Sequence, residues 1–501
     1  MKQRFKFVSA DEAATFVNNG DCVAFSGFTA AGSPKDVPSA IAKRAEEFHK
    51  EGKEFKIGMY TGASTGDSLD GALARAKAIK YRTPYQSNKD MRNALNNAEL
   101  NYYDLHLSTM ALSLRYGFIR HPDFAVIEIS DLKENGEVVL TTGVGISPII
   151  ARMADHVILE WNHYHPKELL GFHDIYEAQN PPHRREIPIY TVSDRIGTTT
   201  LHIDPEKILC VVETNRPDEV GEFTPVDEVT ARIGDNVAAF LASELKKNKI
   251  PSGFLPLQSG VGNIANAVLA SLGKNEDIPP FEMYTEVIQD SVIALMKEGR
   301  VKFASGCSLT VSSDVLNDIY SNLDFYRDKI VLRPQEISNS PEVARRLGLI
   351  SMNTALEADI FGNVNSTHVL GSKMMNGIGG SGDFTRNAYF SIFTTPSTAK
   401  KGKISAIVPM VSHNDQSEHS VKVLITENGV ADLRGKSPRQ RAELIIDQCV
   451  APEYKQMLRD YLKICQPGHT PMNLAACFGM HRQFAKTGNM LDTKWEDYNV
   501  D

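Results

Sequence analysis

Glu286 is the residue of this chain best placed to do chemistry. It follows the run Phe281–Thr285, which predicts a β-strand, and Asp290 then begins a predicted helix that runs to about Glu298. In open α/β sheets, ligands bind at the carboxyl ends of the strands, so a carboxylate there is a candidate acid, base or nucleophile. Taken alone, Glu286 is more simply interpreted as a solvated or ion-paired strand-end residue.

Three glycine-rich loops can bring backbone amides close to an anion or a carbonyl group. They are Gly143–Gly145, Gln258–Asn263 and Gly377–Gly382. The second precedes the apolar helix Ile264–Leu272, so its amides are expected at a helix N-terminus, which favours negative charge. None fits a dinucleotide or Walker pattern, and a tight turn would explain any one of them equally well.

Two histidine clusters are weaker candidates. The segment His413–His419 contains Asp415 and Glu418, but its spacing does not match H-E-x-x-H, and a turn is the favoured interpretation. The segment His163–Pro166 is interpreted in the same way. No serine-hydrolase elbow or nucleophilic cysteine motif occurs, so no metal site and no other nucleophile is predicted.

The composition is that of a folded protein. The chain has 501 residues, 42% of them hydrophobic, and 54 Lys and Arg against 62 Asp and Glu give a net charge of −8. At about 150 residues per domain, this length predicts two to four domains. The chain has no block of like charges, so nucleic acid is not an expected partner.

The cysteines and the N-terminus bear on the compartment. The six cysteines form no C-x-x-C pair, which indicates thiols in a reducing compartment. No apolar run approaches the roughly 18 residues of a membrane span, and the basic start of the chain meets Ser9 and Asp11 instead of an apolar signal core. We therefore expect a cytoplasmic protein with no membrane partner.

The elements of the first half alternate between strands and helices. Ser9–Glu12 is a capping box that predicts a helix ending near Gly20, and Val37–Lys50 predicts a second helix. Short apolar runs predict strands at Cys22–Phe28, Phe55–Tyr60, Phe124–Ile129, His156–Trp161, Ile187–Val192 and Ile208–Glu213. This alternation predicts a mostly parallel sheet covered on both faces.

The pattern breaks at Asn215–Pro225, so we place a domain boundary near residue 220. An amphipathic helix then runs from Val226 to Leu245. Strands are predicted at Phe254–Leu257, Phe281–Thr285, Lys302–Ala304, Ile330–Arg333, Ser405–Pro409 and Val421–Thr426, and helices at Pro438–Val450 and Pro452–Ile464. Residues 1–220 and 221–501 are thus two expected α/β domains of similar size, with a loosely packed arm after Gly479.

Five ordered motifs resemble the acetyl-CoA hydrolase/transferase family and, within it, the bacterial succinyl-CoA:acetate CoA-transferases. They are QSGVGNIAN at 258–266, YTEVIQD at 284–290, NTALEADIFGNVNS at 353–366, GGSGDF at 379–384 and TENGVADLRG at 426–435. With Gly27–Thr29, the similarity spans nearly the whole chain. Several independent motifs in the same order argue against a chance similarity to this family, and they favour a functional role for Glu286.

The resemblance implies a class I CoA-transferase. Such a protein has two open-sheet α/β domains of the NagB/RpiA type, an active site between them, and a catalytic glutamate in the second, which Glu286 matches. That carboxylate would attack an acyl-CoA thioester and pass through a glutamyl-CoA thioester, giving ping-pong kinetics. Coenzyme A would be substrate and covalent intermediate, with no tightly bound cofactor, and a homodimer is expected.

The resemblance also implies roles for further residues. The amides of Val261 and Gly380 would form the oxyanion site, Asn339 would lie near the glutamyl carbonyl, and Ser64 and Glu427 would lie near the active site. The implied CoA contacts are Gln258, Ser259, Gly260, Val261, Gly262, Asn263, Asn376, Gly380 and Lys400. Lys401 is adjacent to Lys400 and is an alternative partner for a phosphate.

Some points stay open from the sequence. Ser291 stands where relatives often have glycine, a change of little expected consequence at the start of a helix. Arg216 is a possible counter-ion for a dicarboxylate such as succinate, although a solvated linker arginine is favoured. An acyl-CoA hydrolase that uses the same glutamate is the nearest alternative to the transferase, and a non-catalytic acyl-CoA-binding protein is a remote one.

Overall fold

The computed structural model describes residues 4–221 and 225–498. The chain divides into two compact units. The first comprises Met1–Glu222, Glu282–Leu347 and Asn376–Asp383, and the second comprises Phe223–Phe281, Gly348–Met375 and Phe384–Asp501. The first division between the two units lies beside the expected boundary near residue 220. Residues 222–224, next to this boundary, lie outside the described part. Unlike in the expected division, the segment that carries Glu286 groups with the first unit.

The first unit contains a nine-stranded sheet in the order β4-β3-β2-β1-β5-β6-β8, with β7 paired to β5 and β9. The pairs are parallel except for β5–β6 and β6–β8, so the predicted mostly parallel sheet is confirmed. The strands are β1 Cys22–Phe25, β2 Ile57–Tyr60, β3 Ile79–Thr83, β4 Asn101–Tyr102, β5 Phe124–Leu132, β6 Glu137–Leu140, β7 His156–Asn162, β8 Leu201–His202 and β9 Ile208–Thr214.

Helices bury apolar faces against this sheet. Val37, Ile41 and Ala45 recur at helical spacing along α2 and join Phe25 and Met59 of the sheet in one buried cluster. The helices in this part are α1 Ala10–Ala14, α2 Asp36–Lys50, α3 Ala72–Arg75, α4 Lys89–Asn96, α5 Leu107–Arg115 and α6 Ser147–Met153. The Ser9 side chain caps α1 as predicted, but this helix is shorter than expected.

The rest of the first unit carries the segment around Glu286. Here β11 Phe281–Tyr284, β13 Val301–Gly306 and β15 Ile330–Leu332 adjoin in the order β15-β13-β11, and β12 Val287–Ile288 pairs with β14 Ser308–Leu309. The helices are α9 Asp290–Lys297, α10 Ser313–Ser321, α11 Leu323–Arg327, α12 Gln335–Ser338 and α13 Pro341–Leu347, and α14 Ser381–Thr385 begins in the third segment. The predicted strand and helix that flank Glu286 are therefore confirmed.

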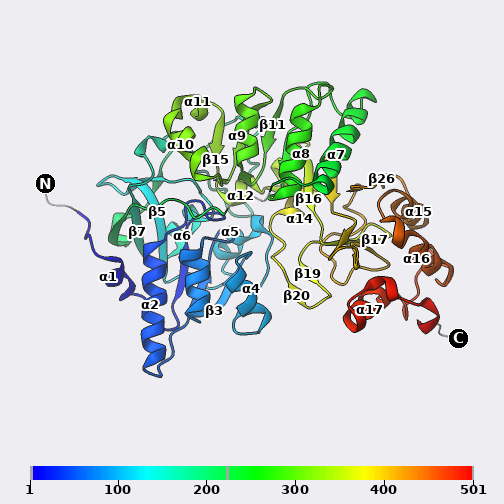
Figure 1. Ribbon diagram of the computed structural model, residues 1–501. Coiled ribbons are helices and arrows are strands. Elements are labelled where there is room, and N and C mark those ends of the chain that lie inside the picture. Colours follow the sequence, from blue (N-terminus) through cyan, green and yellow to red (C-terminus); the bar gives the residue numbers. More distant parts are fainter. Residues whose placement is uncertain (1–3, 222–224, 499–501) are drawn as a thin grey trace. The chain divides into compact units, whose positions relative to one another are not determined.

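The second unit is built on the strand order β10-β16-β21-β25-β26. These strands are Leu257–Ser259, Ile350–Thr354, Phe390–Thr394, Val423–Thr426 and Gly429–Asp432. Short pairs are added by β17 Glu357–Asp359, β18 Val364–Asn365, β19 His368–Val369, β20 Lys373–Met374, β22 Thr398–Ala399, β23 Ile404–Ser405 and β24 Ile407–Val408. Two helices, α7 Glu228–Lys246 and α8 Asn263–Lys274, lie side by side (Figure 1).

The C-terminal segment differs from the expected loose arm. After α15 Pro438–Gln448 and α16 Pro452–Lys463, the chain forms α17 Gly479–Thr487, drawn in orange to red in Figure 1. Met480, Met490 and Trp495 are buried in the core of the second unit. The prediction was wrong because a few widely spaced apolar side chains fix a segment that is polar on average.

Ile187–Val192 is not a strand, which corrects a second prediction. Its alternate residues Ile187, Ile189 and Val192 are buried, but its backbone groups bond to side chains. The Ile187 amide donates to Glu342 at 2.8 Å, and Arg346 donates to the carbonyl of Ile189 at 3.1 Å. The side chains of α13 thus replace a neighbouring strand.

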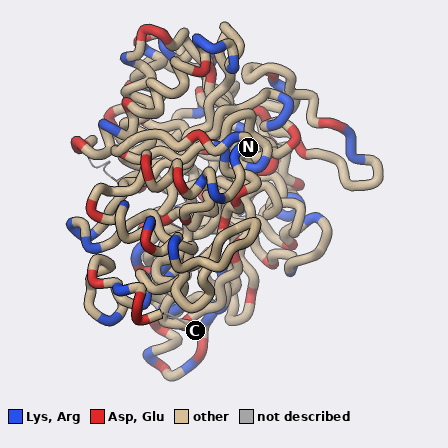
Figure 2. The backbone as a smooth tube through the Cα atoms, turned by 90° about the vertical axis from the view of Figure 1, so that its right-hand side faces the viewer, with Lys and Arg blue, Asp and Glu red and all other residues tan. Residues whose placement is uncertain are grey.

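Two general expectations can be compared with the structure. Lys and Arg are interspersed with Asp and Glu along the chain (Figure 2). Between residues 4–221 and 225–498, no helix has the length and apolar character needed to cross a membrane. All six cysteines are thiols, as expected.

Candidate active site

Glu286 lies in the short connection between β11 and β12, where its backbone is held firmly. Its carbonyl oxygen accepts hydrogen bonds from the amides of Cys307 at 2.6 Å and Ser308 at 3.2 Å. Its carboxylate oxygen Oε1 accepts a hydrogen bond from Nδ2 of Asn339, which follows α12. Two strand ends and one helix end therefore fix the position of this side chain.

The surroundings of Glu286 are largely apolar. Val287 and Cys307 belong to a buried cluster with Phe28, Ala63 and Leu107, and Tyr85 packs against it. Burial raises the pKa of Glu286 to about 7, although the hydrogen bond from Asn339 lowers it in part. A buried carboxylate with a raised pKa is weakly solvated, as suits a nucleophile or an acid–base group.

Gly380 lies directly against this carboxylate. A Cβ atom at position 380 would overlap Glu286 Oε1 and Asn339 Nδ2, so the close approach requires glycine. The preceding loop is docked on the segment before α5. The Ile378 amide donates to Asp104 at 2.7 Å, and the Leu107 amide donates to the carbonyl of Gly379 at 3.2 Å. The structure thus brings together three predicted site residues, Glu286, Asn339 and Gly380.

Ser64 lies in the loop after β2 and is buried. The loop is anchored by Arg82, which forms a two-pronged ion pair with Asp70 at 2.9 Å for both hydrogen bonds. Arg82 also donates to the carbonyl of Ala63 at 3.1 Å, and the Thr65 amide donates to Asp70 at 2.8 Å. Ser64 is thus held between two anchored residues.

The loop Gln258–Asn263 belongs to the second unit and joins β10 to the N-terminus of α8, as the sequence predicted. Gln258 is buried and its Oε1 accepts from Asn353 at 3.1 Å. Val261 is 52% exposed, and Gly262 at the helix N-cap has φ +102°. One end of the loop is therefore fixed in the core, while its tip presents backbone amides at a helix N-terminus, a geometry that favours anions.

The remaining predicted residues are distributed between the units. Glu427 follows β25 in the second unit and accepts hydrogen bonds from the Ser397 amide, at 2.8 Å, and hydroxyl. Lys400 and Lys401 occupy the turn between β22 and β23, and the Lys400 ammonium group lies 5.0 Å from the centre of the Phe484 ring. Asn376 is in the first unit and donates to the carbonyl of Gly377 at 3.0 Å.

The sequence analysis missed Asp383, which interacts with Glu286, and Ser108, which holds Asp383. Asp383 is buried and accepts two hydrogen bonds from Ser108 of α5, from its amide at 3.0 Å and its hydroxyl at 2.5 Å. Burial raises the pKa of Asp383 to about 7, and the neighbouring Glu286 adds to this effect. Asp383 lies within the GGSGDF motif, so that motif was the available signal, whereas nothing in the sequence marked Ser108.

One residue of the His163–Pro166 cluster, His165, belongs to a buried group of charged side chains. His165, Glu128 and Asp218 offer ligand atoms within 4.8 Å of one another, as a metal site would. The ammonium group of Lys35, however, lies 2.5 Å from Glu128 and 3.3 Å from Asp218. Lys35 therefore supplies the cation that these carboxylates require.

Arg216 and the segment His413–His419 were the other charged candidates of the sequence analysis. Arg216 pairs with Asp36 at 2.9 Å and Glu219 at 3.0 Å, which favours a structural role for its guanidinium group. In the segment His413–His419, Asp415 accepts from the Ser366 amide at 2.7 Å and from the Thr367 hydroxyl at 2.8 Å. These bonds are typical of a carboxylate that caps a turn.

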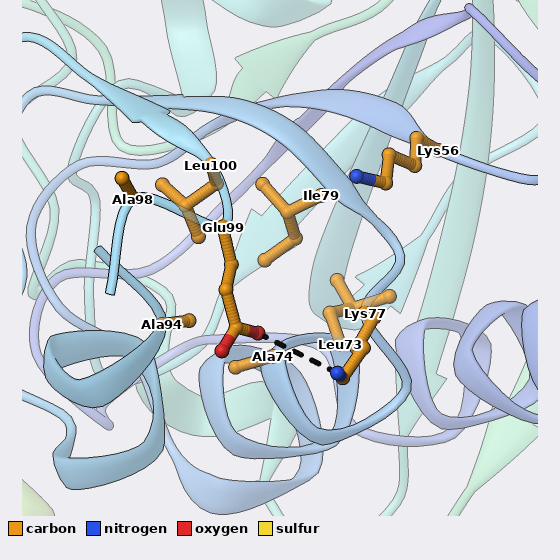
Figure 3. A pocket seen from close by; sticks show the side chains of 9 residues that line it. All are labelled: Lys56, Leu73, Ala74, Lys77, Ile79, Ala94, Ala98, Glu99 and Leu100. Atoms are coloured by element: carbon orange, nitrogen blue, oxygen red, sulfur yellow. Dashed lines mark ion pairs between the residues drawn. The ribbon is translucent and has the colours of Figure 1, made fainter. Parts of the chain in front are cut away.

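A pocket of about 350 Å³ in the first unit is separate from the Glu286 group. Six of the nine residues that line it are apolar, among them Leu73, Ile79 and Leu100, and the others are Lys56, Lys77 and Glu99 (Figure 3). An ion pair of 3.9 Å between Lys77 and Glu99 crosses one side. None of the predicted site residues lines this pocket.

Comparisons with known proteins agree with the resemblance seen in the sequence. Residues 2–213 match the acetyl-CoA hydrolase/transferase N-terminal domain, and residues 316–462 match the C-terminal domain. The chain is 50% identical to the propanoyl-CoA:succinate CoA transferase of Escherichia coli (strain K12), over 98% of this chain and 100% of that protein. It is also 50% identical to the succinyl-CoA:acetate CoA-transferase of Clostridium kluyveri, over 98% of this chain and 91% of that one.

More distant matches extend the comparison. The chain is 40% identical to an acetyl-CoA hydrolase of Schizosaccharomyces pombe, over 96% of this chain and 95% of that protein. RipA from Yersinia pestis has a similar structure, with a TM-score of 0.70 at 22% identity over 91% of this chain and 97% of that one. A 4-hydroxybutyrate CoA-transferase from Porphyromonas gingivalis gives a TM-score of 0.62 at 21% identity, with the same coverage. These two structures support the predicted open-sheet α/β fold.

Proposed function

The chain belongs to the acetyl-CoA hydrolase/transferase family, and we propose that it transfers CoA between an acyl-CoA and a small carboxylate, with Glu286 as the nucleophile. The observation that carries this proposal is the arrangement of Glu286, Asn339 and Gly380. The carboxylate is held by one neutral donor, lies in apolar surroundings and has a pKa raised to about 7. Succinyl-CoA and acetate are the proposed substrates, since the relatives at 50% identity are named for such pairs.

The reaction begins with acyl transfer to the enzyme. Because Asn339 holds Oε1, we take Oε2 of Glu286 as the atom that attacks the thioester carbonyl carbon. The bond between carbon and sulfur breaks, and its electron pair leaves with the CoA thiolate. The product is a mixed anhydride between the acyl group and Glu286.

CoA then moves onto the enzyme. The thiolate attacks Cδ of Glu286, the bond from Cδ to the bridging oxygen breaks, and the first carboxylate leaves with that oxygen. The resulting glutamyl-CoA thioester keeps Oε1 as its carbonyl oxygen, so the Asn339 N–H faces the atom on which negative charge develops. A second carboxylate reverses these steps and leaves as an acyl-CoA.

Other proposed roles rest on the family resemblance. The amides of Gly380 and Val261 are the proposed oxyanion donors, and Ser64 and Glu427 the further active-site residues. The proposed CoA contacts are the loop Gln258–Asn263, Asn376, Gly380 and Lys400, with loop amides and the lysine suited to phosphate groups. The proposed domain division is that of the sequence, near residue 220.

Hydrolysis of acyl-CoA is the second candidate, because the S. pombe relative is named an acetyl-CoA hydrolase. Water would then replace the second carboxylate at the glutamyl-CoA stage. Release of free CoA from succinyl-CoA, measured with and without added acetate, separates the two functions. A transferase forms acetyl-CoA in proportion to acetate, and CoA release that ignores acetate would overturn the transferase proposal.

We also propose a cytoplasmic homodimer. The six thiols suit a reducing compartment. Sedimentation analysis of the purified chain tests the dimer directly, since a single species with the mass of one chain would contradict it.

A further inference from the structure

Asp383 is a buried carboxylate that the steps above do not use. It lies on α14, three residues after Gly380, and is 4% exposed. Ser108 of α5 donates to both of its oxygens, through the amide to Oδ2 at 3.0 Å and through the hydroxyl to Oδ1 at 2.5 Å. These two bonds fix the plane and the position of the Asp383 carboxyl group.

On its other side, Asp383 interacts with the carboxamide that holds Glu286. The Asn339 side chain donates to Glu286, and it also acts as a hydrogen-bond partner that lowers the pKa of Asp383. The hydroxyl of Ser338 donates to Asn339 Oδ1 at 2.9 Å. Since a carboxamide nitrogen carries two hydrogens, this orientation turns the Asn339 nitrogen toward both carboxylates and its oxygen away from them.

The geometry points to Asp383 as a positioning residue for CoA transfer, which fixes the Asn339 carboxamide in the orientation that donates to Glu286. This inference rests on the proposed function of Glu286. A flipped carboxamide would place its oxygen against two acidic groups, and Asp383 disfavours that state through its own hydrogen bond. The donor is therefore in place before the glutamyl carbonyl acquires charge, which is the arrangement that lowers a barrier most.

Asp383 also brings a second titratable carboxyl group beside the nucleophile. Two further titratable groups that interact with Glu286 are Tyr85, from the loop after β3, and Cys307, between β13 and β14. Burial raises the pKa values of both well above their usual ranges, so both stay neutral between pH 5 and 9. The acidic limb of the pH profile is then a property of the coupled Glu286–Asp383 pair.

The test is Asp383→Asn, measured by the rate at which the enzyme forms glutamyl-CoA in a single turnover across pH 5 to 9. The substitution keeps one acceptor but removes the charge. We expect a rate loss of about 10- to 100-fold from poorer placement of Asn339. We also expect the acidic limb to move to lower pH by roughly 0.5 to 1 unit, because the neighbouring carboxyl no longer titrates.

Two further variants separate positioning from general damage. Asp359→Asn makes the same change at a buried aspartate of the second unit, which is held by its own turn through the Phe361 and Asn363 amides at 3.0 and 2.9 Å. It should leave the rate and the pH profile unchanged. Ser108→Ala removes one hydrogen bond to Asp383 but keeps the Asp383 carboxyl group. It should therefore give a smaller rate loss than Asp383→Asn.

The outcomes distinguish this inference from the proposed function. If wild-type enzyme forms no adduct on Glu286, the proposed function fails. If wild type forms it and Asp383→Asn does so at the same rate with an unchanged acidic limb, Asp383 is not a positioning residue. An equal effect of Asp359→Asn would also overturn the inference, since the loss would then follow from any buried aspartate.

Discussion

Two groups of buried carboxylates in the first unit have opposite surroundings. Around Lys35, the carboxylates of Glu128 and Asp218 lie 2.5 and 3.3 Å from an ammonium group. Glu286 has no ion pair with any residue that the structure describes, and its Oε1 meets the neutral carboxamide of Asn339. One group is compensated by charge, whereas the other is held by a neutral donor.

The proton affinities follow from this difference. Burial alone would lower the pKa of Lys35, but Glu128 and Asp218 raise it above its usual range. Burial likewise acts to raise the pKa of Asp218, but Lys35 and His165 bring it below its usual range. At Glu286 nothing offsets burial fully, and the pKa is about 7. The buried ammonium group thus keeps the Asp218 carboxylate ionised, whereas Glu286, which has no such partner, keeps a raised pKa that suits chemistry.

The largest effect is expected for Glu286→Gln. This variant keeps the size of the side chain and removes the nucleophile, so we expect transfer activity to fall by at least about 10⁴-fold. Circular dichroism should show an unchanged fold. A variant that retains even a tenth of the activity would show that Glu286 does not form the covalent intermediate.

Lys35→Met should destabilise the buried group in which the ammonium group of Lys35 compensates the charges of Glu128 and Asp218. It leaves Glu128 and Asp218 buried without their cation, which is expected to cost about 3–5 kcal/mol of the free energy of unfolding. Urea unfolding measures the change. The control is Lys43→Met, also on α2, whose 3.2 Å pair with Asp11 is exposed and is worth less than about 1 kcal/mol. Equal losses in the two variants would contradict the contrast.

Gly380→Ala should disturb the group of Glu286 and Asn339, which has no compensating cation, and it removes no charged side chain. The added Cβ would displace Glu286 and Asn339, so we expect kcat to fall by about 10²- to 10³-fold. Gly253→Ala is the control, because a Cβ there meets nothing within 4 Å. Steady-state kinetics of the two variants would contradict the account if both behaved like the wild type.

The smallest effect concerns stability and pH. The fold raises the pKa of Glu286 from 4.5 to about 7, so the folded chain binds this proton more tightly than the unfolded chain. Ionisation above pH 7 therefore costs stability, and the cost disappears as the pH falls toward 4.5. Glu286→Gln cannot ionise and should exceed the wild type by on the order of 1–3 kcal/mol at pH 8, but by less than about 1 kcal/mol at pH 5. A gain that does not depend on pH, measured by urea unfolding, would contradict the raised pKa.

The sequence predicted those parts of the fold and site that depend on local pattern. The strand before Glu286 and the helix after it follow from apolar runs and a helix start. The family resemblance of the motif GGSGDF indicated Gly380, and the structure shows that its close approach to Glu286 and Asn339 demands glycine. These signals lie within a few residues of the positions they identify.

Contacts between distant segments could not be predicted in this way. Ser108 and Asp383 are 275 residues apart, and their hydrogen bonds arise only when α5 and α14 meet. Ile187–Val192 has the alternation of a strand, but Glu342 and Arg346 satisfy its backbone groups. Trp495 fixes a polar segment through a core that the local sequence does not display. In each case tertiary partners, and not local propensity, decide the structure.

The central claim is a covalent bond between CoA and Glu286, and borohydride trapping tests it most directly. The enzyme is incubated with succinyl-CoA, treated with borohydride, digested and analysed by mass spectrometry. The account predicts that the thioester is reduced to an alcohol on the peptide that contains Glu286, and that Glu286→Gln gives no such product. An unmodified Glu286 in enzyme that still transfers CoA would contradict the account.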